Sequence, residues 1–208
     1  MRSLGARLDA CLALIEGAGS VVDVGTDHGR LPVYALKEGR AERAVAVDIS
    51  EKSLKKAALL AEKEGVSLRL VVCDGLQGVA EGDAELVVIA GMGAHEIVKI
   101  LEEAPFPLKK AVFVPHAHAP LLRRYLREKD VRLERDIVVK EGSHFYAVML
   151  ADFSLPWREE DNLYVGREGE ARDAYIETRL AKIERFLACK EDPALEEEKE
   201  ILTHVYRS

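Results

Sequence analysis

Residues 21–29 read Val-Val-Asp-Val-Gly-Thr-Asp-His-Gly, and this stretch decides the fold class of the 208-residue chain. A run of β-branched residues ends there in a turn that holds two glycines and two carboxylates. Such runs, when they alternate with segments of helical period, are typical of parallel strands in an α/β sheet. Because glycine lets the backbone approach a ligand closely, the stretch predicts a first strand followed by a ligand-binding turn.

Strand and helix patterns alternate on both sides of this stretch. Helices are predicted over residues 3–16, 31–39, 51–64 and 119–129, with another that ends near residue 101. Further strands are predicted over residues 44–48, 68–72, 85–90 and 111–114, and the strands 132–139 and 144–151 form a closing hairpin. Ser50 and Gly65 are expected to cap the helix between them. The pattern predicts an α/β fold with a mostly parallel sheet and one antiparallel strand.

The strand pattern stops after Pro156, which indicates a separate C-terminal region. Residues 176, 180, 183 and 187 are apolar and lie at coiled-coil-like spacing, and a second helix is expected after Pro193. We therefore predict one domain over residues 1–153 and an α-helical extension over residues 154–208. A helical hairpin docked on the main domain is the main expectation, and a dimerising or RNA-clamping arm is the alternative. The chain is expected to be a monomer or a weak homodimer held by these helices.

Charge and composition narrow the function classes. The net charge is −7, but residues 152–208 carry 15 acidic and 9 basic side chains, so the first 151 residues are nearly neutral. A basic nucleic-acid-binding face is therefore compatible with the first domain. No apolar run is long enough to span a membrane, and three widely spaced cysteines predict neither disulfides nor a metal site. A cytoplasmic protein without membrane contact is expected.

Acidic residues follow three successive strands, where an open parallel sheet binds its ligands. Asp48 ends the second strand, where a carboxylate can accept both hydroxyls of a ribose, and Asp74-Gly75 follows the third, within reach of an adenine. Asp23 and Asp27 repel phosphate but suit a cationic ligand that carries an amine. S-adenosylmethionine, with its sulfonium and ammonium groups, has these properties. The alternative is that Asp48 and Asp74 only cap helices.

Three motifs resemble those of a known family. They are Asp-Val-Gly-Thr-Asp-His-Gly-Arg-Leu-Pro at residues 23–32, Cys-Asp-Gly-Leu at 73–76 and Ile-Ala-Gly-Met-Gly at 89–93. They resemble the bacterial TrmK-like tRNA (adenine(22)-N1)-methyltransferases, a family of class I enzymes, over residues 7–150. The resemblance implies a Rossmann-like fold with a seven-stranded sheet, helices on both faces, S-adenosylmethionine as methyl donor and tRNA as acceptor.

The resemblance also implies roles for individual residues. Asp23, Gly25, Asp27 and His28 would line the methionine end of the donor. Asp48 and Ile49 would hold the ribose side, and Asp74 and Gly75 the adenine. The floor near the sulfonium would consist of Ala90, Gly91, Met92 and Gly93. The chain departs from the family at residues 114–116, which read Val-Pro-His where relatives have Gln-Pro-Asn.

Methyl transfer to N1 of adenine needs positioning and the handling of one proton. N1 already carries a lone pair, and methylation makes the ring cationic, so a carboxylate or a neutral imidazole near the base can stabilise the charge or accept the proton. The candidates for this catalytic role are Asp27, His28 and His116. Met92 or Tyr146 can act as the wedge that extracts a base from its stack, with burial in the core as the alternative.

A basic cluster after the fifth strand is the candidate RNA-binding surface. Its members are Arg123, Arg124, Arg127 and Lys129, and a solvated helix face is the alternative. Methylation of another RNA, a protein or a small molecule stays open, as does a binding-only protein. A metal-dependent hydrolase built on His116 and His118 is a further alternative. Because no metal-ligand spacing supports it, no metal is expected.

Overall fold

The computed structural model describes residues 3–207, and its centre is one seven-stranded sheet. The strands are β1 (Ala18–Val24), β2 (Ala41–Asp48), β3 (Arg69–Val72), β4 (Leu86–Ala90), β5 (Lys110–Val114), β6 (Arg132–Glu141) and β7 (His144–Asp152). Their order in the sheet is β3-β2-β1-β4-β5-β7-β6. β7 alone runs antiparallel to its neighbours β5 and β6. The predicted fold, a mostly parallel sheet with one antiparallel strand, is confirmed.

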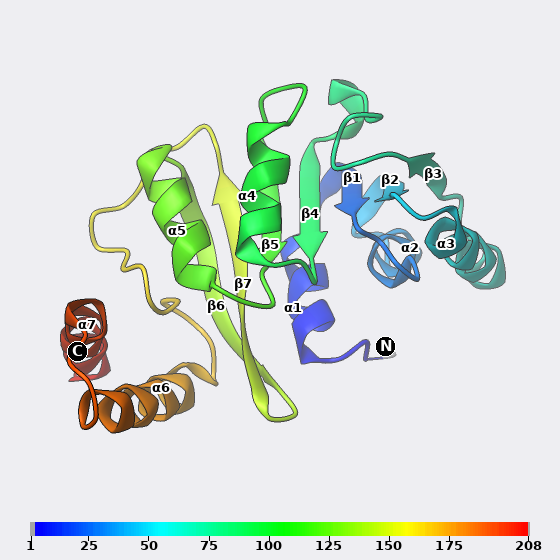
Figure 1. Cartoon of the computed structure of the whole chain (residues 1–208). Helices are drawn as coiled ribbons and strands as arrows, with labels where there is room; N and C mark the ends of the chain where they lie inside the picture. Colours follow the sequence, from blue (N-terminus) through cyan, green and yellow to red (C-terminus); the bar gives the residue numbers. More distant parts are fainter. Residues whose placement is uncertain (1–2, 208) are drawn as a thin grey trace.

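Helices cover both faces of the sheet (Figure 1). They are α1 (Ala6–Leu14), α2 (Arg30–Lys37), α3 (Glu51–Glu64), α4 (Ala94–Glu102), α5 (Ala119–Glu128), α6 (Arg172–Leu187) and α7 (Pro193–Arg207), with a short 3-10 helix η1 (Glu81–Asp83). α1 and α2 pack on one face, with α3 beside α2, and α4 and α5 pack on the other. Alternate residues of β1 belong to two apolar clusters, one on each face of the sheet. Val22 and Val24 lie in the cluster with α4, and Val21 lies in the cluster with α1. This alternation is what period-2 strands buried on both faces produce.

Two helix predictions show how local side chains set helix ends. The helix expected over residues 51–64 is confirmed, because the Ser50 hydroxyl accepts a hydrogen bond from the Ser53 N–H at 3.3 Å and Gly65 ends the helix. The helix expected over residues 3–16 is shorter, Ala6–Leu14. Asp9 Oδ1 accepts the Leu4 N–H at 2.8 Å, which holds the residues before Ala6 in a turn instead of a helix.

A strap of residues 163–169 runs along the free edge of β6 before the chain enters α6. The Val138 N–H donates to the Glu168 carbonyl at 2.8 Å, and the Glu168 N–H donates to the Asp136 carbonyl at 3.1 Å. A Cβ on Gly169 would lie 2.2 Å from the Val138 carbonyl oxygen, and φ of Gly169 is +113°, so this position requires glycine. The strap therefore covers the edge of the sheet through backbone contact.

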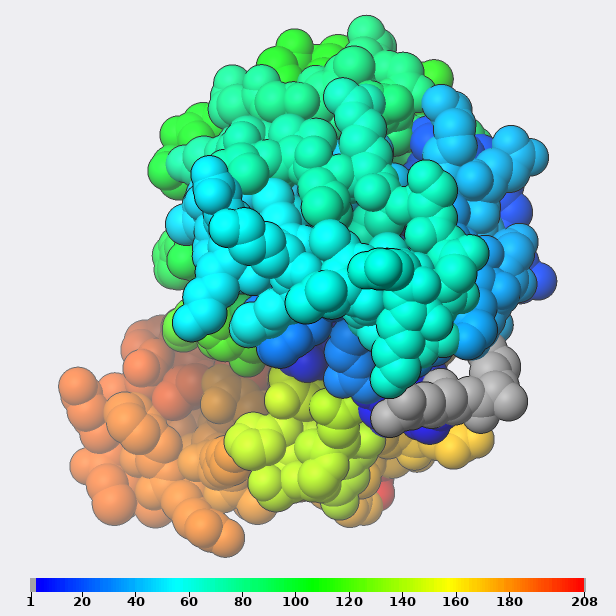
Figure 2. Space-filling view, turned by 90° about the vertical axis from the view of Figure 1, so that its right-hand side faces the viewer, coloured from blue at the N-terminus to red at the C-terminus, as the bar shows by residue number. Residues whose placement is uncertain are grey.

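The C-terminal helices pack on the strap and on each other. Ile176, Ile183 and Leu202 are buried with Val165 and Val138 in a third apolar cluster, so the apolar seam of α6 faces its own chain. Figure 1 shows α6 and α7 beneath the sheet, at the end toward which β1 and β4 point. Figure 2 shows the α3 and β3 side in front, with the C-terminal helices projecting below and to one side. No helix among residues 3–207 is long and apolar enough to cross a membrane.

Candidate functional site

The predicted ligand-binding turns meet at one edge of the sheet because the parallel strands end in register. Val24 pairs with Val47 of β2 and Ile89 of β4, and Ala90 pairs with Val114 of β5. The turns after these strands therefore lie side by side, at the edge where open α/β sheets bind ligands. Three cavities open along this edge, and together they are lined by the site residues expected from the motifs except Gly93, which directly precedes α4.

The first cavity, of about 330 Å³, lies between the ends of β1, β2 and β3. Asp48 lines this cavity, and its Oδ2 accepts the Asp27 N–H at 3.2 Å while Oδ1 accepts the Ser50 N–H at 2.8 Å. Ile49, Asp74, Gly75 and Met92 line the same cavity. Ile49 is 73% exposed and contributes an apolar surface to this cavity. The carboxylates and the apolar wall suit a ribose and a flat base.

The second cavity, of about 360 Å³, lies beside the first and shares Gly25 with it. It is lined by Asp23, Asp27, His28, Ala90 and Gly91 among others. Asp23 is buried at 4% exposure, and its Oδ2 accepts the Thr26 hydroxyl at 2.6 Å. Burial raises the pKa of Asp23 from 3.8 to about 6, a shift that Thr26 opposes and the charge of Asp48 reinforces. At neutral pH the cavity thus holds a buried carboxylate that attracts a cation.

Asp27 and His28 form a small polar group at the mouth of the second cavity. Asp27 has a left-handed backbone with φ of 48°, and its carboxylate lies 3.3 Å from His28 Nε2 and 3.7 Å from Lys56 Nζ. Lys56 Nζ is also 3.4 Å from His28 Nε2. Both predicted residues are exposed and stand on the rim of the cavity, where a ligand can reach them.

Met92 separates the two cavities by packing on Gly25. φ of Gly25 is +73°, a backbone conformation that favours glycine, and a Cβ there would lie 2.2 Å from Cε at the flexible end of Met92. The predicted wedge role of Met92 concerns the acceptor, whereas its side chain here packs on Gly25, which the first and second cavities share. That role stays a prediction.

Two hydrogen bonds of His116 and one of its neighbour Val114 hold the loop after β5 against the turn after β4. The His116 N–H donates to the Met92 carbonyl at 3.0 Å, and the Gly91 N–H donates to the Val114 carbonyl at 3.1 Å. His116 Nδ1 lies 3.1 Å from the Gly91 carbonyl oxygen. A carbonyl oxygen can only accept, so Nδ1 carries the proton and Nε2 of the neutral ring is left as an acceptor.

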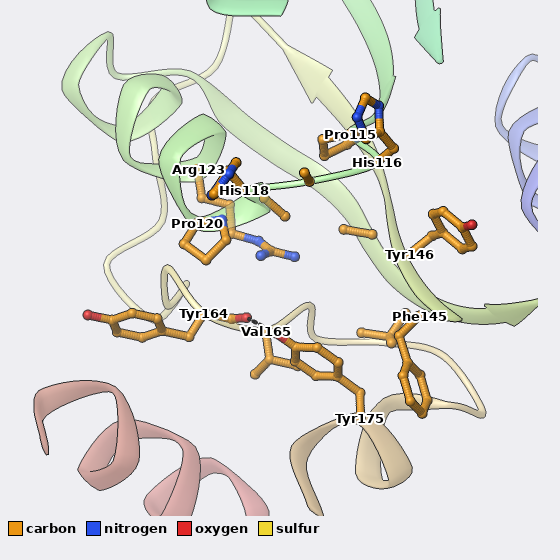
Figure 3. Close-up of a pocket in the computed structure, with 14 residues that line it drawn as sticks. Pro115, His116, His118, Pro120, Arg123, Phe145, Tyr146, Tyr164, Val165 and Tyr175 are labelled. Atoms are coloured by element: carbon orange, nitrogen blue, oxygen red, sulfur yellow. Dashed lines mark hydrogen bonds between the residues drawn. The ribbon is translucent and has the colours of Figure 1, made fainter. Parts of the chain in front are cut away.

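A third cavity, of about 200 Å³, begins at His116 and continues toward the C-terminal region (Figure 3). One wall is the loop from Pro115 to Pro120, and another is the start of β7 with Phe145 and Tyr146. The strap and α6 complete the cavity with Tyr164, Val165 and Tyr175. Phe145 and Tyr175 pack edge to face, with ring centroids 5.8 Å apart. This cavity is therefore aromatic and includes residues from both predicted regions of the chain.

Comparison with known proteins agrees with this geometry. The family model described as "Methyltransferase domain" matches residues 4–149, which is more than half of the chain. The chain belongs to this methyltransferase domain family. The predicted membership of the methyltransferases is thereby confirmed.

Individual relatives of the methyltransferase differ in what they act on. The tRNA (adenine(22)-N(1))-methyltransferase of Bacillus subtilis is 30% identical over 154 residues, which are 72% of this chain and 65% of that protein. The ribosomal protein L11 methyltransferase of Pelotomaculum thermopropionicum is 45% identical over 99 residues, 45% of this chain and 32% of that protein. The aligned part thus spans less than two thirds of either relative.

A solved structure extends the likeness to the whole fold. The structure of TrmK from M. capricolum, in complex with S-adenosyl-homocysteine, superposes with a TM-score of 0.81 at 20% identity. The match covers 100% of this chain and 97% of that chain. The α6–α7 hairpin is thus part of the architecture that the two proteins share.

The methyltransferase differs from the prediction in its basic cluster. Arg124 and Arg127 on α5 are exposed, as is Lys129 directly after the helix, whereas Arg123 is 2% exposed. Arg123 donates from Nε and Nη2 to the two oxygens of Asp136, at 2.7 and 2.9 Å. The prediction that Arg123 belongs to an exposed basic surface is therefore wrong. Its neighbours Leu122 and Leu126 are buried on α5, so Arg123 lies on the flank of the helix that packs on β6.

Sequence reasoning missed the aromatic residues of the third cavity. Only Tyr146 was singled out, whereas Phe145, Tyr164 and Tyr175 share the wall with it. The density of aromatic residues around the closing hairpin was the available signal. Among residues 3–207, no three His, Cys, Asp or Glu side chains cluster as metal ligands do. His118, the other histidine of the metal alternative, instead packs with His95, their ring centroids 5.9 Å apart.

Proposed function

We propose that this methyltransferase transfers the methyl group of S-adenosylmethionine to N1 of adenosine 22 in tRNA. The observation that carries the proposal is the pair of adjoining cavities, one built around Asp48 and one around Asp23, next to a histidine acceptor on the acceptor side. The likeness to the enzyme from Bacillus subtilis supports the choice of acceptor.

The residues of the two donor-side cavities suit the parts of S-adenosylmethionine. Asp48 and Ile49 bind the ribose, Asp74 and Gly75 border the adenine, and the buried charge of Asp23 attracts the ammonium group. Gly25 provides the open backbone shared by the two cavities, and Met92 packs against it. When bound, the donor supplies an electrophilic methyl group on a sulfonium.

On the acceptor side, the chain has to position one adenine and stabilise the positive charge that the ring gains on methylation. The N1 lone pair forms the new bond to the methyl carbon, and the electrons of the broken carbon–sulfur bond remain on sulfur. The methylated ring is cationic, and the free Nε2 of His116 can accept its N6 proton. Asp27 and His28 are the alternative acceptors on the opposite rim.

The partner and compartment follow from this proposal. tRNA is the partner, the cytoplasm is the compartment, and exposed Arg124, Arg127 and Lys129 contribute positive charge outside the site. A monomer or a weak homodimer through the C-terminal helices remains the expected assembly.

The test is methylation of a tRNA transcript with labelled S-adenosylmethionine, followed by mass spectrometry of the nucleosides. We expect 1-methyladenosine in the native transcript and none when adenosine 22 is replaced by guanosine. A transcript changed at another unpaired adenosine is the matched control and should be methylated normally. Donor binding without methylation of any tRNA would favour a protein substrate, as in the L11 methyltransferase relative, and would contradict the proposal.

A further inference from the structure

Arg123 brings hydrogen-bond donors into the third cavity. Figure 3 shows its guanidinium pointing from α5 into the space between His118 and Tyr175. Asp136 accepts from Nε and Nη2, and the Leu163 carbonyl accepts a long bond of 3.4 Å from Nη1. A guanidinium has five N–H groups, so one N–H on each terminal nitrogen is left for a ligand.

The charge around Arg123 argues against a phosphate as the ligand. Both carboxylate oxygens of Asp136 pair with Arg123, so the positive charge of the guanidinium is already neutralised within the fold. A second carboxyl, Asp161, lies close enough for the charge of Asp136 to contribute to its raised pKa, although burial is the larger cause. The cavity thus offers N–H donors without excess positive charge, which suits neutral acceptor atoms better than an anion.

The size and walls of the cavity suit one flat ring system. Its volume of about 200 Å³ is below the ~300–1,000 Å³ typical of sites for drug-sized ligands, so a base fits the cavity better than a whole nucleotide. Phe145, Tyr175 and Pro120 supply flat apolar surfaces, and Lys140 lies 5.4 Å from the centroid of the Phe145 ring. Aromatic residues next to basic side chains are the usual platform for unstacked RNA bases.

The donor pattern selects among the bases. Asp136 occupies the Nε–Nη2 side and the Leu163 carbonyl takes one N–H of Nη1, so a ligand that uses both remaining N–H groups would meet them as a fork of two donors. Guanine offers two adjacent acceptors, O6 and N7, to such a fork, and this is the commonest specific arginine contact with a base. Adenine places an N6 donor next to N7, so the fork meets a donor there. The methylated adenine is therefore a poor occupant.

We propose that the third cavity binds a guanine of the substrate RNA, separate from the methylated adenine, through its O6 and N7 atoms. The inference rests on the proposed function for its RNA ligand. Because Tyr175 and the strap belong to the C-terminal region, this pocket gives that region a part in substrate selection. Arg123 is in this view a specificity residue that reads a base from inside the fold.

The test changes the RNA and leaves the protein intact. A tRNA transcript made with 7-deazaguanosine keeps O6 and base pairing but replaces every N7 by C–H. We expect the native protein to bind it at least about tenfold more weakly than the unmodified transcript, the factor that corresponds to one hydrogen bond from a charged donor. A transcript with inosine in place of individual unpaired guanosines keeps O6 and N7 and should bind normally. Single 7-deazaguanosine substitutions then locate the guanine.

Protein variants connect this loss to the cavity. Arg123→Lys keeps a charge beside Asp136 but lacks the fork, and Phe145→Leu removes a stacking wall. In both variants, the affinities for the unmodified and the 7-deazaguanosine transcripts should differ by less than about twofold. Arg124→Lys on the same helix should keep the native difference in affinity. If Arg123→Lys fails to fold, Phe145→Leu and the RNA series still decide the question.

Two results would overturn the proposal. One is equal binding of the 7-deazaguanosine and unmodified transcripts by the native protein. The other is a difference that persists unchanged in Phe145→Leu, because the N7 atom would then be read elsewhere. Methylation of adenosine 22 and donor affinity, measured in the same samples, report separately on the proposed function and stay intact if only the guanine pocket is wrong.

Discussion

The proposed donor side, made of the first and second cavities, and the proposed acceptor side, made of the third cavity, are built in different ways. The two cavities of the donor side are lined mainly by turns that directly follow β1, β2, β3 and β4. The third cavity combines the loop after β5, the start of β7, the strap and α6. A site made of strand-end turns is fixed once the sheet forms, whereas the acceptor side depends on contacts between distant segments.

The largest expected effect is on the acceptor side, at the buried pair of Asp136 and Arg123. Asp136→Ala leaves a buried guanidinium without its partner, so we expect the free energy of unfolding to fall by about 3–5 kcal/mol. Urea unfolding followed by circular dichroism measures this change. Arg135→Ala, which breaks an exposed pair with Glu168, should cost below about 1 kcal/mol. Similar losses of stability in Asp136→Ala and Arg135→Ala would contradict the view that the buried pair matters more than the exposed one.

On the donor side, the buried carboxyl of Asp23 should reduce stability at neutral pH. Its pKa is about 6 in the folded protein against an ordinary 3.8, so folding favours the protonated form. The stability gained from that proton is complete below about pH 3.8 and is lost as the pH rises through 6. Asp23→Asn should therefore be more stable than the native protein above pH 6, by up to about 3 kcal/mol.

The same Asp23→Asn variant should bind S-adenosylmethionine more weakly, since the charge that attracts the ammonium is gone. Urea unfolding at pH 4.5 and pH 7.5 tests the stability part of the prediction, and calorimetry tests the affinity. A stability gain of equal size at both pH values would show that the side chain, and not its ionisation, is responsible.

The strap should be sensitive at its closest approach to β6. Gly169→Ala places a Cβ against the Val138 carbonyl at a backbone conformation unfavourable for alanine, so we expect a loss of about 1–3 kcal/mol. Gly142→Ala is the matched control, because it also has a positive φ but no atom within 4 Å of the new Cβ. Thermal unfolding of the two variants gives the comparison. An equal loss in both would mean that the strap contact adds nothing.

Asp48→Ala tests the donor side directly. Asp48 orders the turn at Asp27 and lines the first cavity. Its removal should therefore lower the affinity for S-adenosylmethionine by at least about tenfold. Isothermal titration calorimetry measures the affinity, and Glu51→Ala, an exposed carboxylate at the start of α3, is the control. Unchanged affinity in Asp48→Ala would remove this residue from the site.

The smallest effect is expected at His116, where the two sides meet. His116→Ala should lower turnover up to about tenfold, because N1 needs no base for attack, and should leave donor affinity unchanged. His116→Asn restores the residue that the resembling family has there and should keep methylation measurable. Single-turnover rates over a range of pH provide the test. A profile for His116→Ala equal to the native one would make His116 a packing residue.

Sequence alone predicted the two sides unequally, and the reason is physical. Gly25, Asp48 and Asp74 were found because each directly follows a strand whose pattern is local. Arg123 was misplaced because its ion-pair partner lies on the next strand, and helix periodicity does not show which flank receives a buried charge. Tyr164 and Tyr175 belong to a segment with no strand pattern, so their approach to the sheet depends on tertiary contacts.

The strap also has a consequence for the order in which the chain is made. Residues 163–169 follow all seven strands, so a nascent chain carries an open β6 edge until its last fifth is synthesised. Open edges pair with other chains, and intermediates that expose them are prone to aggregate. The strap thus completes the third cavity and shields the newly made sheet in the same step.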